Sequence, residues 1–113
     1  MAWRLTARAS VTAASVAALL GGCGTPEVIR RVAAAHPGAT YEATATGCGS
    51  TAPASRRFGG DLRLAVLWSR ETARAARQLP CEIVIDAVTG GSRQPVYRVR
   101  LAREGRTEGA VPP

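Results

Sequence analysis

Residues 81–101 read CEIVIDAVTGGSRQPVYRVRL, and this stretch decides the fold. Apolar and polar residues alternate before and after a central Thr-Gly-Gly-Ser sequence, which is typical of two strands joined by a tight turn. The stretch therefore predicts an antiparallel hairpin with one buried face. We expect Tyr97, Val99 and Leu101 to point inward and Arg98 and Arg100 outward.

The residues just before this hairpin predict one further strand and one helix. Residues 61–68, DLRLAVLW, alternate in a way that favours a strand. Ser69 is a suitable helix cap and Pro80 a suitable stop, so we expect a helix over residues 70–79. We expect the apolar face of the strand to carry Leu62, Leu64, Val66 and Trp68, and the inner face of the helix to carry Ala73, Ala76 and Leu79.

The rest of the chain supplies elements at either end. Thr25 and Pro26 form a favourable start for a helix that ends at His-Pro-Gly, residues 36–38. Residues 39–46 predict a half-buried strand, residues 47–60 a long loop and residues 104–113 a disordered tail. The predicted fold class is α+β within residues 23–103: a small antiparallel sheet with two helices packed on one face, in the order α-β-β-α-β-β.

The first 22 residues have the layout of an export signal. Arg4 and Arg8 precede an uncharged stretch of small and apolar residues, which is too short to span a bilayer. This stretch ends in Leu20-Gly21-Gly22-Cys23, which resembles the lipobox of bacterial lipoproteins. The resemblance implies cleavage of the signal peptide, residues 1–22, and acylation of the Cys23 thiol, so that Cys23 becomes a lipid-anchored N-terminus.

A chain anchored in this way belongs to the cell envelope. Gly24 occupies the position where Asp favours the inner membrane in enterobacterial lipoproteins, so the resemblance favours the outer membrane, facing the periplasm. Only Gly24 separates Cys23 from the expected helix cap, so we expect the domain to lie against the membrane. The alternative is an alanine-rich N-terminal helix in which Cys23 is an ordinary small core residue.

Cys48 and Cys81 remain as the other two cysteines of the chain. Export places them in an oxidising compartment, where two thiols in a small domain usually form a disulfide. Such a bridge would close a loop of about 30 residues and stabilise the domain by about 3–4.7 kcal/mol. The alternative is a redox or metal pair, which the lack of a CxxC spacing and the single histidine disfavour.

The composition restricts both the size and the chemistry of the protein. The 113 residues leave room for one small domain, and 46% of them are hydrophobic but only 4% aromatic. His36 is the single histidine, and a capping role at the expected helix end explains it. No serine stands in a nucleophile motif, and the glycine pairs lack a phosphate-loop pattern. We therefore expect no catalytic residue, no metal, no cofactor and no enzyme activity.

All fifteen basic residues are arginines, and together with eight acids they give a net charge of +7. Basic surfaces beside a lipid anchor would face the membrane or another anionic envelope polymer. Nucleic acid is not an expected partner, because the chain lacks aromatic stacking platforms. The alternative is the coding bias of a GC-rich genome, since acids are interspersed among the arginines. The expected basic surface residues are Arg70, Arg74 and Arg77 on the helix and Arg98 and Arg100 on the strand, where Glu82 and Asp86 are the available partners.

Two short segments resemble PepSY-type domains. The helix end Ala35-His36-Pro37-Gly38-Ala39 leads into a strand, and residues 83–90, IVIDAVTG, are similar to the strand and Asp-Ala-x-Thr-Gly turn of that family. The resemblance implies a binding or inhibitory module without catalytic residues. The loop at residues 47–60, the second helix and the strand after the turn depart from the family's pattern.

Together these features predict a membrane-anchored lipoprotein that acts as a small non-catalytic binding or structural module. Its expected partners are the membrane, through the anchor, and either an anionic envelope polymer or a protein. The alternative is an inhibitor or accessory subunit of an envelope hydrolase or of a secretion system.

Overall fold

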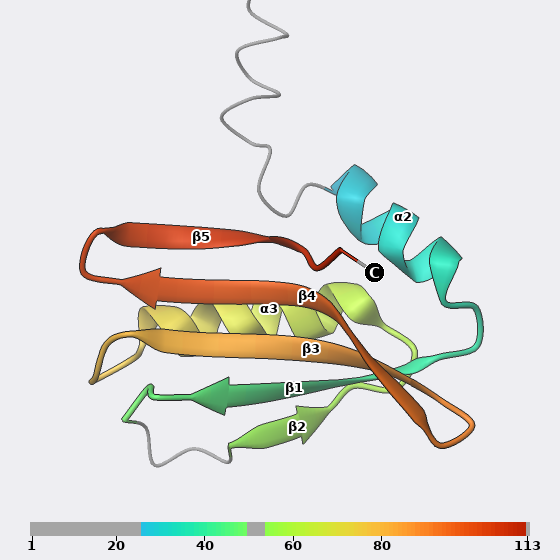
Figure 1. The fold of residues 1–113 in the computed structure, drawn as a ribbon, viewed down its shortest axis with the longest axis horizontal. Helices are drawn as coiled ribbons and strands as arrows, with labels where there is room; N and C mark the ends of the chain where they lie inside the picture. Colours follow the sequence, from blue (N-terminus) through green and yellow to red (C-terminus); the bar gives the residue numbers. More distant parts are fainter. Residues whose placement is uncertain (1–25, 50–53, 113) are drawn as a thin grey trace, which may run out of the picture.

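The computed structural model describes residues 26–49 and 54–112, which fold into two helices and one five-stranded sheet (Figure 1). All neighbouring strands are antiparallel, and their order across the sheet is β2-β1-β3-β4-β5. The predicted α+β class is confirmed. In chain order the elements are α2 (Pro26–Ala35), β1 (Thr40–Thr46), β2 (Ser55–Arg57), α3 (Leu62–Arg74), β3 (Cys81–Thr89), β4 (Ser92–Ala102) and β5 (Gly105–Ala110).

The hairpin of β3 and β4 lies within the sheet as predicted. Every second residue of β3 is buried, and Ile83 and Ile85 are fully enclosed. In β4 the residues expected to point inward are buried or half-buried, and the arginines expected outside are exposed. A register shift between Ile85 and Asp86 inserts one extra residue, Val96, into β4, and both Val96 and Tyr97 are buried there.

The segment at residues 61–68, expected as a strand, forms the first half of helix α3 instead, so that prediction is wrong. Asp61 caps the helix, because its carboxylate accepts a hydrogen bond from the Leu64 N–H at 3.2 Å. The buried residues of α3 recur at helical spacing. They are Leu62, Ala65, Val66, Ser69 and Ala73.

The helix expected over residues 70–79 is also placed differently. Ser69, the expected cap, is buried inside α3, and its hydroxyl donates a hydrogen bond to the Ala65 carbonyl oxygen at 2.7 Å. Because α3 already ends at Arg74, the chain beyond it is not helical. Leu79, expected against the sheet, is 42% exposed.

Two strands of the sheet were not expected. β2 lies inside the expected loop at residues 47–60, where it pairs with β1 and sets Arg57 opposite Glu42. β5 lies inside the expected disordered tail at residues 104–113, where it pairs with β4 and sets Glu108 opposite Val99. Both expectations are corrected by the structure, and the order of elements is α-β-β-α-β-β-β.

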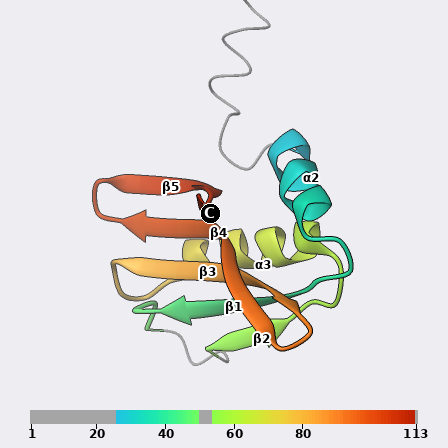
Figure 2. The ribbon, with the colours of Figure 1, turned by 45° about the vertical axis from the view of Figure 1, so that its right-hand side comes forward.

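Helix α3 covers one face of the sheet and contacts β1, β3 and β4 (Figures 1 and 2). Helix α2 contacts α3 and β5 and has one buried residue, Ile29. No element of the described residues covers the opposite face, which we call the outer sheet face. By strand alternation, the outer sheet face carries Glu42, Thr44, Arg57, Glu82, Val84, Asp86, Arg93, Arg98, Arg100 and Thr107.

Candidate functional site

Two neighbouring acids lie between two arginines across four strands of the outer sheet face. Glu42 lies on β1, Asp86 on β3, Arg57 on β2 and Arg93 on β4. The Arg93 guanidinium bridges the two acids, because its Nη1 lies 2.6 Å from Glu42 Oε1 and 3.3 Å from Asp86 Oδ2. On the other side of Glu42, Arg57 Nε donates to Oε2 at 3.2 Å. These four side chains form a continuous charged row across the sheet.

The electrostatics of this row keep Glu42 ionised. Hydrogen bonds from Arg93, and then from Arg57, lower the pKa of Glu42 below its ordinary value. The Glu42 side chain is only 15% exposed, whereas Arg57 is 88% and Arg93 50% exposed. The arginine side chains are therefore open to a partner while the acid between them is held in place.

A second pair lies further along the outer sheet face. Arg98 Nε is 3.7 Å from Glu82 Oε2, which confirms the expected pairing of Glu82 with a β4 arginine. Asp86, for which the same partners were expected, pairs with Arg93 instead. Arg100 makes no ion pair with any of the described residues and is exposed. The outer sheet face is thus a mosaic of both charges.

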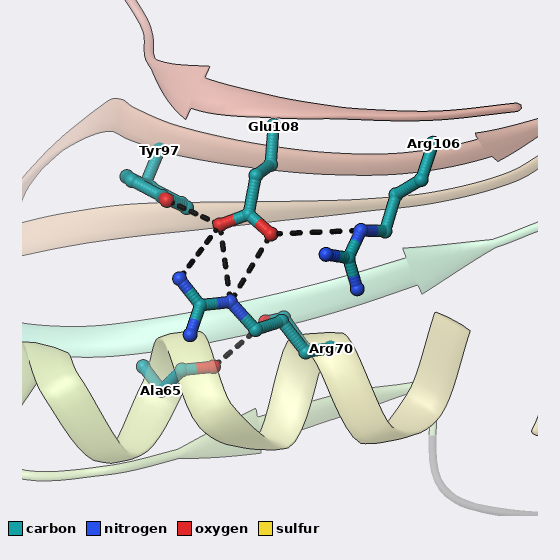
Figure 3. A network of polar contacts seen from close by, with 6 residues as sticks. Ala65, Arg70, Tyr97, Arg106 and Glu108 are labelled. Atoms are coloured by element: carbon teal, nitrogen blue, oxygen red, sulfur yellow. Dashed lines mark hydrogen bonds and ion pairs between the residues drawn. The ribbon is translucent and has the colours of Figure 1, made fainter. Parts of the chain in front are cut away.

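A different polar cluster lies on the inner side of the sheet, where Glu108 of β5 faces helix α3 (Figure 3). The Glu108 side chain is 1% exposed. Its carboxylate accepts hydrogen bonds from Arg70 Nε, at 3.1 Å to each oxygen, and from Arg70 Nη2 at 3.0 Å. The Tyr97 hydroxyl donates to the same carboxylate at 2.5 Å, and Arg106 Nε lies 3.8 Å away. We call these four residues the Glu108 cluster.

The Glu108 cluster is an ionised and fully paired network. Burial alone raises the pKa of Glu108, but hydrogen bonds from Arg70 and Tyr97 outweigh it, so this pKa lies below its ordinary value. Burial and the hydrogen bond to Glu108 raise the pKa of Tyr97, which stays protonated as a donor. No buried side-chain N or O atom among the described residues lacks a hydrogen-bond partner. The cluster is therefore suited to holding β5 against α3.

The five arginines expected to form basic surfaces are dispersed. Arg70 does not lie on the solvent-exposed face of its helix, since its side chain is 24% exposed and pairs with Glu108. Arg74 is exposed and lies 3.9 Å from Glu71, and Arg77 is exposed beyond the end of α3. Arg98 and Arg100 belong to the outer sheet face, on the other side of the sheet from α3. The expected helix surface is corrected because α3 starts at Leu62 and turns Arg70 toward β5.

The expected disulfide between Cys48 and Cys81 is present. Both cysteines are buried, and their Cα atoms are 4.3 Å apart. The Cys48 carbonyl oxygen also accepts hydrogen bonds from the N–H groups of Arg77 and Gln78, at 2.9 and 3.2 Å. The bridge and these bonds tie together the end of β1, the start of β3 and the segment after α3.

Of the remaining candidate residues, Cys23 lies outside the described residues and His36 lies within them. The signal segment, residues 1–22, also lies outside the described residues. His36 follows the end of α2, is half-buried and lines a shallow cavity of about 200 Å³ together with Gln94 and Val111.

Within residues 26–49 and 54–112, no three His, Cys, Asp or Glu side chains gather as metal ligands would. In the same residues, no helix has the length and apolar character needed to cross a membrane.

Sequence reasoning missed the charged row and the Glu108 cluster. Arg93 and Glu42 are far apart in the chain, as are Arg70 and Glu108, and only the sheet brings each pair together. A weak signal for the cluster was Tyr97 itself, since a buried tyrosine hydroxyl requires a polar partner.

Comparisons with known proteins do not assign this chain to a family. No protein-family model matches it, and neither the curated proteins nor the solved structures include a significantly similar one. The resemblances to the lipobox and to PepSY-type domains therefore stay predictions.

Proposed function

We propose that this protein is a small outer-membrane lipoprotein, anchored through Cys23, whose domain binds a partner in the periplasm and has no catalytic activity of its own. The anchor rests on the order of two arginines, an uncharged stretch and Leu20-Gly21-Gly22-Cys23. The disulfide between Cys48 and Cys81 supports an exported location, because such bonds persist in oxidising compartments.

The binding role is carried by one observation, the outer sheet face, which no described element covers and which carries the row Arg57, Glu42, Asp86 and Arg93. Mutual ion pairs hold these side chains in place, so a partner would not need to order them on binding. Charges of both signs side by side select a partner by complementarity, which favours a protein surface over a uniformly anionic polymer. No catalytic role is proposed, because in the described part of the chain His36 forms no ion pair with Glu42 or Asp86.

The anchor is tested by expressing the full chain in a bacterium that matures lipoproteins. We expect membrane fractionation and a mass that corresponds to an acylated chain starting at Cys23. The variant Cys23→Ser should lose the acyl mass and the membrane association that depends on it. An unmodified chain that retains its first 22 residues would contradict the proposal.

The binding face is tested by site-specific photocrosslinking in the envelope of the native bacterium. A benzoylphenylalanine at Thr44 samples the outer sheet face, and one at Arg103, in the turn between β4 and β5, is the matched control. We expect a discrete protein adduct from the first position only, and we expect Arg93→Glu to abolish it. An adduct with a hydrolase or a secretion component would identify the inhibitor or accessory alternative. Equal labelling at both positions would refute the outer sheet face as the binding site.

A further inference from the structure

Helix α3 exposes two large apolar side chains on the side that faces away from the sheet. Leu64 is 52% and Leu67 47% exposed, and they are three residues apart on the same side of the helix. Beside them Trp68 is half-buried and packs against Phe58, with 5.7 Å between the ring centroids. Leucines exposed together on one side of a helix point to an interaction surface. We call Leu64, Leu67 and Trp68 the leucine face.

Three arginines and two acids surround the leucine face. Arg63 and Arg74 are exposed on the same helix, and Arg56 lies over the Phe58 ring at 5.4 Å from its centroid. Of the two acids, Asp61 caps α3. Glu71 follows Leu67 by four residues on the same side of the helix and lies 3.9 Å from Arg74. Apolar residues bordered by arginines are typical of helices that lie in the interface of an anionic bilayer. Arginine side chains suit this position because their stems reach along apolar surface to the headgroups.

The place where the chain enters the domain also favours a bilayer as the partner of the leucine face. The described residues begin at Pro26, three residues after Cys23. Pro26 and Arg63 line a common groove of about 500 Å³ between α2 and the start of α3. Three extended residues span about 10 Å at most. An anchor at Cys23 would therefore hold the bilayer close to the end of α3 from which the leucine face begins.

The size of the leucine face argues against a second copy of the chain as its occupant. A stable protein interface buries about 1,200–2,000 Å² in total, with a well-packed apolar centre. Two half-exposed leucines and one half-buried tryptophan supply only a small part of that area. A bilayer needs no complementary shape, so a small apolar face suffices when an anchor already holds the domain beside it.

We propose that the leucine face of α3 docks on the anionic surface of the bilayer that holds Cys23. This inference rests on the proposed lipid anchor. Because α3 and the outer sheet face lie on opposite sides of the sheet, docking turns the outer sheet face away from the membrane (Figure 2). The membrane thus orients the charged row toward the periplasm, where a partner can reach it.

The native tryptophan provides the test. The full chain has two tryptophans, Trp3 and Trp68, and cleavage before Cys23 leaves only Trp68. The mature protein is purified, its acylation is checked by mass, and it is reconstituted into phosphatidylcholine–phosphatidylglycerol vesicles with and without brominated chains. We expect strong quenching of Trp68 by the brominated lipid, and weaker quenching when phosphatidylglycerol is omitted.

The decisive variant is the double substitution Leu64→Ser with Leu67→Ser. Its ratio of docked to undocked protein should fall about tenfold, because two half-exposed leucines lose their burial in lipid. Leu79→Ser is the matched control, since Leu79 is similarly exposed but lies beyond α3; its quenching should match that of the wild type. Circular dichroism of both variants should show an intact fold, because the substituted positions are exposed.

Each outcome is informative. A purified chain without acyl mass defeats the proposed anchor, and that result is seen before any quenching is measured. An acylated protein whose Trp68 is not quenched overturns the docking and leaves the anchor standing. Trp68 could instead escape lipid quenching but become more shielded as the protein density on the vesicle rises. That result would identify a second copy as the partner and overturn the proposed docking on the bilayer.

Discussion

Replacing Glu108 by Gln tests whether the Glu108 cluster holds the last strand in place. The substitution keeps the size of the side chain but removes the charge that Arg70 and Tyr97 surround. Breaking a buried ion pair from one side costs about 3–5 kcal/mol, because the other charge remains. Arg70 is 24% exposed, so water can solvate part of its charge, and we expect the lower end, about 3 kcal/mol.

The measurement is urea denaturation of the oxidised protein with its disulfide intact. The matched control is Glu104→Gln, because Glu104 is an exposed acid in the turn just before β5. The control should change the free energy of unfolding by less than about 0.5 kcal/mol. Amide hydrogen exchange should show that the loss of protection in Glu108→Gln is concentrated in β5.

The pH dependence follows from the direction of the pKa shift. The pKa of Glu108 is lower in the folded protein than its ordinary value of 4.5. The stability contributed by its ionisation is therefore fully present above that value and is lost as the pH falls through the folded-state pKa. The difference between wild type and Glu108→Gln should be largest near neutral pH and shrink in acid. A difference below about 1 kcal/mol at neutral pH would refute the reasoning.

Three further predictions concern other parts of the fold. Cys81→Ser should lower the free energy of unfolding by about 3.7 kcal/mol, measured in urea against the oxidised wild type, since it frees a loop of 33 residues that begins at Cys48. Arg93→Ala should raise the pKa of Glu42 toward its ordinary value in a carboxyl NMR titration, and an unchanged pKa would contradict the assigned contact. Asp61→Ala should destabilise α3 by about 1 kcal/mol through loss of its cap, whereas Asp61→Asn should leave thermal unfolding nearly unchanged.

The hairpin of β3 and β4 was predictable because its information is local. Alternation around a Gly-Gly turn indicates both strands, and Tyr97 is buried as expected, although the bulge also buries Val96. The disulfide was predictable from the cysteine count, since the expected lipidation of Cys23 leaves Cys48 and Cys81 as each other's partners.

Helix α3 was mispredicted because the apolar residues at 62–68 fit both the hydrophobic period of a strand and that of a helix. Leu62 and Val66 are four residues apart, so they lie on one face in a strand and also on one face in a helix. Both are buried in α3. Leu64 and Ala65 distinguish the two arrangements, because Leu64 is exposed and Ala65 is buried. The Asp61 cap, a local signal that was present in the sequence, favoured the helix.

Strand β5 was missed because its inner face is polar. An apolar pattern would have marked it, but its buried side chain is Glu108, whose partner Arg70 lies 38 residues earlier in the chain. Hydrophobic periodicity cannot reveal a strand whose burial depends on an ion pair with a distant helix. The same limit applies to the charged row on the outer sheet face.

The position of Glu108 on an edge strand has a consequence for solubility. β5 is the last strand of the sheet among the described residues, and such margins can recruit strands from other molecules. A carboxylate that points inward from this margin disfavours the stacking of further chains, because each added copy would have to accommodate a charge. The charge of Glu108 should therefore limit the association of copies through β5, apart from its contribution to stability.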